Sequence, residues 1–177
     1  PDDAPPQAPA GAAGGLVTPL KPVSTNALAG LMEALAAPPY GGKADLPQLA
    51  SALRYDADTL FPIAEAMQQL RFARLDQGDL RLLDAAQRYV RADTDARKQL
   101  FAQHLLGYVP IVAHIRRVLD DRATHEAPAS RFRDELEDHM TEDCAERTLQ
   151  AAIQWGRYAE LYAYEDETGR FTLDNPA

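Results

Sequence analysis

The sequence has a single cysteine, a single tryptophan and few basic residues, and it contains no long apolar run. No segment approaches the roughly 18 consecutive apolar residues that a membrane-spanning helix needs. One cysteine, Cys144, excludes an internal disulfide and fits a reducing compartment. Only 18 Lys and Arg stand against 27 Asp and Glu, which gives a net charge of −9. This balance argues against a polyanionic partner and favours a soluble protein.

The overall composition, with 46% hydrophobic and 25% charged residues, is that of an ordinary globular protein. A length of 177 residues allows one larger domain or two domains of roughly 70 residues each. Residues 1–22 are mostly Pro, Ala and Gly, and we predict that they form a flexible linker. A linker at the start of a chain that begins at Pro1 rather than Met suggests that another domain precedes it.

One pattern occurs twice, an apolar helix that runs directly into a short strand–turn–strand. The first copy is a helix from Asp56 or Asp58 to Leu70, followed by a hairpin over residues 72–82 that turns at Asp76–Asp79. The second is a helix over residues 141–161, followed by a hairpin that turns at Glu167–Gly169. Because further helices precede each copy, we predict a mainly α fold with small β-hairpin wings. It would comprise two tandem winged-helix-like subdomains, residues 23–92 and 93–177, joined through a helical centre.

Helix boundaries follow from capping residues and from Pro and Gly. Ser24, Thr25 or Asn26 can cap a first helix that ends at residues 38–42, and Asp45 with Gln48 forms a capping-box pattern. The remaining helices are expected over residues 85–92, from Asp95 through Leu106, over residues 110–119 and over residues 130–139. Residues 127–129 are expected to form a loop.

The charges on the candidate recognition helices disfavour DNA binding. The helix at residues 56–70 carries Asp56, Asp58 and Glu65 and no Lys or Arg, whereas duplex DNA requires a cationic face. The first hairpin contains Arg71, Arg74 and Arg81, but acidic residues lie at its tip. We therefore expect no nucleic-acid partner and interpret the hairpins as packing or protein-contact elements.

No catalytic, cofactor-binding or metal-binding residue is predicted in this segment. Glu135 and His139 are four residues apart and could share a metal on one helix face, but no third ligand is evident, so a solvated acidic face is the favoured interpretation. Residues 41–43 lack the spacing of a phosphate-binding loop, and no Ser or Cys nucleophile has a motif around it.

Two groups of residues are candidates for a partner interface. Arg116 and Arg117 begin the one basic concentration of the chain, although pairing with nearby residues such as Asp120 and Glu135 is the favoured alternative. Trp155, Tyr158 and Tyr162 belong to an aromatic group that can anchor the second hairpin in the core or serve as an interface.

Several segments resemble one family, namely residues 28–35, 44–50 and 96–102 and, most specifically, residues 152–164 with the Asp-Glu-Thr-Gly turn that follows. They are similar to the AAA-associated C-terminal domain of ABC-transporter ATPase subunits of nitrate/sulfonate/taurine-type importers. The resemblance covers residues 23–173. It implies a non-catalytic, cytoplasmic regulatory domain that lies at the inner membrane only through the transporter. Its partners would be its own N-terminal ATPase domain, transporter subunits or a second copy. ATP and Mg²⁺ would belong to that missing ATPase domain.

Two alternatives remain open at this level. A small-ligand sensor for an anion or a nucleotide would have a pocket between the two subdomains, lined by His104, Tyr108, His114 or Tyr158. A DNA-binding winged-helix regulator would need a cationic groove assembled from both halves.

Overall fold

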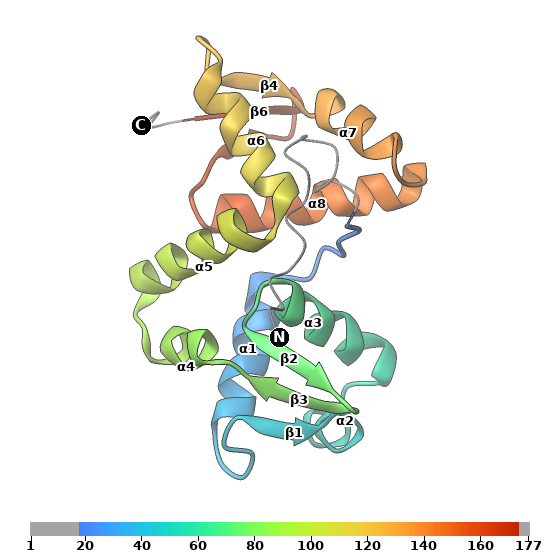
Figure 1. Cartoon of the computed structure of the whole chain (residues 1–177), viewed down its shortest axis with the longest axis vertical. Coiled ribbons are helices and arrows are strands. Elements are labelled where there is room, and N and C mark those ends of the chain that lie inside the picture. Colours follow the sequence, from blue (N-terminus) through green and yellow to red (C-terminus); the bar gives the residue numbers. More distant parts are fainter. Residues whose placement is uncertain (1–17, 174–177) are drawn as a thin grey trace, which may run out of the picture.

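The computed structural model describes residues 18–173, which are mainly helical and contain eight helices and six short strands. The same order of elements occurs twice, namely a helix, a short strand, two helices and a hairpin (Figure 1). The first half contains α1 (Thr25–Ala36), β1 (Lys43–Asp45), α2 (Leu46–Leu53), α3 (Ala57–Gln69), β2 (Ala73–Asp76) and β3 (Asp79–Leu82). The second half contains α6 (Pro110–Asp121), β4 (Glu126–Pro128), α7 (Ala129–Glu137), α8 (Glu142–Tyr158), β5 (Ala163–Glu165) and β6 (Arg170–Thr172). Between them lie α4 (Asp84–Arg91) and α5 (Thr94–Tyr108).

The helices begin at side chains that accept hydrogen bonds from otherwise unpaired backbone N–H groups. The predicted caps Ser24, Asp45, Asp56 and Thr141 each accept a bond from the N–H group three residues later. The predicted start of α5 was wrong by two residues, because Asp93 rather than Asp95 caps the helix. Helix α5 also continues through Gly107 to Tyr108, and α6 then begins at Pro110.

Both predicted hairpins are present, and each belongs to an antiparallel sheet of three strands, ordered β1-β3-β2 and β4-β6-β5. In the first hairpin, Gln77 and Gly78 both have positive φ, as the tight turn between twisted strands requires. The edge strands β1 and β4 were not predicted, and residues 127–129, expected to be a loop, contribute Ala127 and Pro128 to β4.

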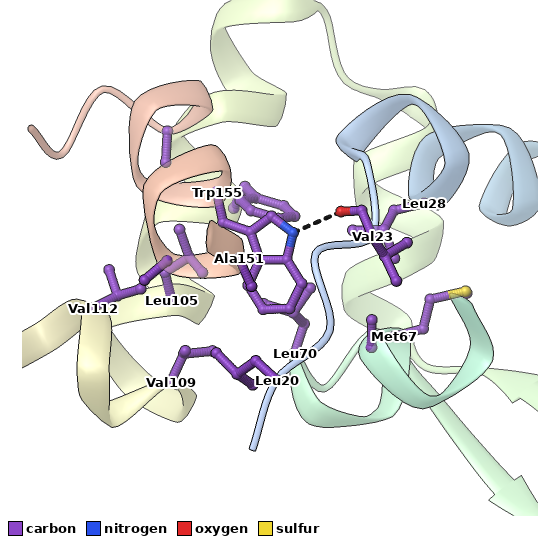
Figure 2. Packing of buried hydrophobic residues seen from close by; sticks show 14 of the residues in the cluster. Leu20, Val23, Leu28, Met67, Leu70, Leu105, Val109, Val112, Ala151 and Trp155 are labelled. Carbon is purple, nitrogen blue, oxygen red and sulfur yellow. Dashed lines mark hydrogen bonds between the residues drawn. The ribbon is translucent and has the colours of Figure 1, made fainter. Parts of the chain in front are cut away.

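A short segment ahead of α1 joins the two halves, and we call residues 19–23 the strap. The backbone N–H of Leu20 donates to Thr148 Oγ1 at 3.1 Å, and Trp155 Nε1–H donates to the carbonyl oxygen of Val23 at 2.8 Å. Leu20 and Val23 are buried, and Figure 2 shows both beside Trp155. Of the linker expected over residues 1–22, residues 1–17 lie outside the described residues, whereas Leu20 is packed in the core.

The apolar core passes through this junction without a break. A single cluster of buried side chains includes Leu28 and Met67 of the first half, Leu105 of α5, and Val112 and Trp155 of the second half (Figure 2). The two halves therefore share one core, which includes the strap.

Candidate functional site

The aromatic candidates of α8 and the residues after it lie inside the molecule. Trp155 has no exposed surface, and its N–H group donates to Val23 in the strap. Tyr162 is buried, and its hydroxyl donates to the carbonyl oxygen of Ala152 at 2.6 Å. Burial raises the pKa of Tyr162 far above its ordinary range. The predicted role of these two residues as core anchors is confirmed.

Tyr158 forms a polar contact across the junction. Its hydroxyl lies 2.6 Å from the hydroxyl of Tyr89, so that α8 is linked to α4. Burial, together with this hydrogen bond, raises the pKa of Tyr89 above its ordinary range. The Tyr89 hydroxyl therefore remains protonated at neutral pH, and its contact with Tyr158 positions the two helices.

The basic candidates are mostly paired within the chain. Arg116 donates through Nη1 to the carbonyl oxygen of Leu161 at 2.7 Å and through Nε to Asp120 at 3.2 Å. This confirms the internal pairing that was the favoured alternative for Arg116. Arg117 is exposed on the same helix. The structure thus leaves Arg117 as the accessible residue of the pair.

The Glu135–His139 pair does not form a metal site. Glu135 instead accepts a hydrogen bond from Arg131 Nε at 3.1 Å and lies 2.6 Å from His114 Nε2, while His139 is exposed. Among residues 18–173, no group of three His, Cys, Asp or Glu side chains could hold a metal ion. The network around Glu135 connects α6 to α7 and has a structural role.

His104 lies at the edge of the core. Its Nδ1 is 2.6 Å from the carbonyl oxygen of Leu70, and its ring stacks on Phe72 with centroids 4.4 Å apart. The imidazole thus occupies the end of α3, where a backbone carbonyl would otherwise lack a partner. This matches the general expectation for a histidine beside an apolar stripe.

A hollow lies where the two halves meet, and we call it the junction cleft. It has a volume of about 490 Å³, and its wall includes Thr18, Gln69, Arg71, Arg74, Tyr108 and Ile111. Of the four residues predicted to line a pocket between the halves, Tyr108 does so, whereas His104, His114 and Tyr158 are not part of this wall. Arg71 and Arg74 were noted only as hairpin residues, because their sequence spacing does not show that β2 and the α5–α6 connection approach each other.

A second, smaller feature is an apolar groove between α2 and α3. It has a volume of about 160 Å³ and is lined by Leu46, Pro47, Ala50, Ala57, Leu60 and Phe61. Phe61 is 50% exposed, and Tyr55, in the connection between the two helices, is 41% exposed. Large apolar side chains exposed beside an apolar groove are typical of a contact surface.

The comparisons with known proteins identify the family. The model of the C-terminal AAA-associated domain matches residues 47–165, about two thirds of the chain. The chain belongs to this family, whose description indicates an accessory domain of an AAA/ATPase protein. No curated protein and no solved structure matches the chain. Within residues 18–173, no helix is both long enough and apolar enough to cross a membrane.

Proposed function

We propose that this chain is the non-catalytic C-terminal accessory domain of an ABC-importer ATPase subunit and that it regulates the ATPase through protein contact. The observation that carries the proposal is the match to the C-terminal AAA-associated domain. The resemblance of residues 152–164 to the importer subtype supports the more specific assignment. In this arrangement ATP and Mg²⁺ bind to the ATPase domain, and the accessory domain changes how readily that domain completes its cycle.

We further infer that residues 23–92 and 93–177 are winged-helix-like units used for packing and contact. The repeated order of helix, strand, two helices and hairpin supports this inference, as does the equivalent strand order in the two sheets. Helix α3, in the position of a recognition helix, carries Asp58 and Glu65 and no basic residue, which favours a protein partner over DNA.

The apolar groove of α2 and α3 is the contact surface that fits this role. The aromatic residues of α8 are buried or half-buried, whereas Phe61 is exposed in the groove and Tyr55 is exposed in the connection between α2 and α3. Because Phe61 is already half-buried, covering the rest of its side chain would contribute about half of the roughly 1.5–3 kcal/mol that full burial gives. We assign the ATPase domain of the same polypeptide as the occupant of the groove.

The path of the N-terminal segment supports this choice of occupant. Thr18 and Lys21 share a small hollow with Pro62 and Glu65 of α3, the residues that follow Phe61 along the helix. The chain that would lead back to a preceding domain therefore leaves the described structure beside the helix that carries the exposed phenylalanine. A contact with a domain of the same polypeptide is intramolecular, which raises its occupancy without requiring a large interface.

The test is the ATPase rate of the full-length subunit. We expect Phe61→Ser and Tyr55→Ser to change the rate or the nucleotide affinity in the same direction as truncation before Leu16. Leu106→Ser is the matched control, because Leu106 is 44% exposed on α5 and does not line the groove. An ATPase rate that is unchanged by truncation would refute regulation. If Phe61→Ser altered only the sedimentation of the isolated chain, the occupant would be a second copy and not the ATPase domain.

A further inference from the structure

The junction cleft contains basic side chains that no carboxylate neutralises. Arg71 follows α3 and Arg74 lies on β2, and both form part of the wall. Among residues 18–173, no Asp or Glu lies within ion-pair distance of either guanidinium, and none belongs to the wall. In the same part of the chain, eight of the sixteen other Lys and Arg side chains form ion pairs. The two arginines are therefore available to an anion from solution.

Arg71 is held at the cleft by its backbone and by its side chain. Its φ is +61°, a left-handed conformation that residues with a Cβ rarely adopt. Its guanidinium carbon lies 5.5 Å from the ring centroid of Tyr108, which belongs to the opposite wall. A cation over an aromatic face retains its N–H donors at the edge of the guanidinium plane. Arg71 therefore spans the junction and still has donors for a ligand.

Arg74 belongs to a row of like charges across the first sheet. It lies directly opposite Arg81 on β3, and Arg81 lies directly opposite Lys43 on β1. Like charges in directly opposed positions destabilise a sheet unless something neutralises them. Lys43 is paired with Asp79 at 3.6 Å, but within the described residues Arg74 has no such partner. An anion bound beside Arg74 would relieve this repulsion.

The second sheet shows that the row is not a general property of the repeated unit. At the corresponding positions of the second sheet, Thr172 lies opposite Glu126 on one side and Ala163 on the other, and none of the three is basic. The row of like charges thus belongs to the half whose hairpin lines the junction cleft.

The rest of the wall provides a polar rim and an apolar floor. Helix α6 begins in the cleft, with Pro110 and Ile111 in the wall, and its N-terminus has no side-chain cap. The positive end of a helix adds to the attraction of the arginines for an anion. Leu20, Ala73, Leu83 and Val109 are apolar neighbours that can contact the body of a ligand. A volume of about 490 Å³ is within the usual range of small-molecule sites.

We propose that the junction cleft binds a small organic anion whose phosphate or carboxylate group is held by Arg71 and Arg74. Planar guanidinium groups suit both kinds of oxyanion, since they donate two parallel hydrogen bonds. Tyr108 positions Arg71, and the apolar floor favours a ligand with a hydrocarbon or aromatic body. Because Leu20 of the strap and the preceding Thr18 belong to the wall, a bound ligand also contacts the segment that joins the halves. This site does not depend on the proposed contact with an ATPase domain.

The test uses the whole 177-residue chain with three probes, inorganic phosphate, phenyl phosphate and benzoate, in low-salt calorimetric titrations. We expect phenyl phosphate to bind at least tenfold more tightly than inorganic phosphate, because only the former reaches the apolar floor. Comparison of phenyl phosphate with benzoate tells which oxyanion the arginines prefer. Amide NMR shifts caused by the ligand should fall on residues 18–23 and 107–111, which a nonspecific charge effect would not select.

The variants are chosen to separate specific contacts from overall charge. Arg71→Gln and Arg74→Gln should each lower the affinity for phenyl phosphate at least tenfold, and Arg71→Lys should lower it less. Arg81→Gln is the matched control, since Arg81 is exposed on the same sheet and does not belong to the wall. Equal weakening by Arg81→Gln, or absence of binding by all three probes to the unaltered chain, would overturn the proposal. Tyr108→Ala provides a second variant should an arginine substitution impair folding, with the same expected loss.

Discussion

Two helical glycines show how strongly the local environment determines the effect of one methyl group. Gly156 lies within α8, where an added Cβ would overlap the ring of Tyr162. That ring cannot swing aside easily, because it is buried and its hydroxyl is bonded to the carbonyl oxygen of Ala152. Gly30 lies within α1 on an exposed face, and nothing within 4 Å would meet its Cβ. Glycine is thus required at one position and only tolerated at the other.

Alanine at these two positions should have opposite effects on the free energy of unfolding. For Gly156→Ala we expect net destabilisation, because overpacking costs about 1–3 kcal/mol while the gain in helix propensity is at most about 1 kcal/mol. For Gly30→Ala we expect a gain of about 0.5–1 kcal/mol. Urea denaturation of both variants beside the unaltered chain measures the difference. Stabilisation by both substitutions would show that the ring of Tyr162 moves aside at little cost.

At the scale of elements, the strap contributes more to holding the two halves together than its composition indicates. It is bounded by Pro19 and Val23 and is too short for a periodic pattern. Even so, two of its backbone groups bond to α8, at Thr148 and Trp155. Its carbonyl at Pro19 also accepts a hydrogen bond from Gln69 Nε2 at 3.2 Å. These bonds connect one short segment to helices of both halves.

Shortening the side chain of Leu20 should therefore lower the free energy of unfolding, whereas shortening that of its neighbour Lys21 should not. Leu20→Ala is expected to destabilise the chain by about 2–5 kcal/mol, because it leaves a cavity between the halves. Lys21→Ala, the control, changes an exposed side chain and should stay within about 0.5 kcal/mol of the unaltered chain. Thermal unfolding of the two variants compares them directly. Equal melting temperatures would mean that the Leu20 side chain adds nothing to the stability of the fold.

The elements predicted from sequence are those with local determinants. Caps such as Ser24, Asp45 and Thr141 act within one turn, and the hairpins have turn residues at fixed positions. The strands β1 and β4 have three residues each, and only pairing with β3 and β6, far away in sequence, defines them. Likewise, Tyr108 was a predicted pocket residue, but its approach to Arg71 depends on how the two halves pack.

At the scale of the whole molecule, the interior is continuous. Trp155 is covered from one side by the strap, and Tyr158 meets Tyr89 of α4 across the junction. The buried cluster includes side chains of both halves and of α5 between them. The repeat seen in the order of elements is thus not matched by two separate cores.

The chain should accordingly unfold in one cooperative step. In differential scanning calorimetry we expect a single transition whose calorimetric and van't Hoff enthalpies agree, because neither half retains a complete core without the other. Circular dichroism and tryptophan fluorescence should report the same midpoint, since Trp155 lies at the junction. Two resolved transitions would show that residues 23–92 and 93–177 fold as independent units.

The strap also defines a mechanical path through the domain. Leu20 and Val23 are tied to Thr148 and Trp155, and these ties precede α1 in the order of the chain. Tension applied at Thr18 therefore reaches α8, in the second half, before it reaches α1, the helix next in sequence. A force that pulls on the N-terminal segment therefore acts first on the contacts between the two halves. The start of α1 bears this force only after those contacts have broken.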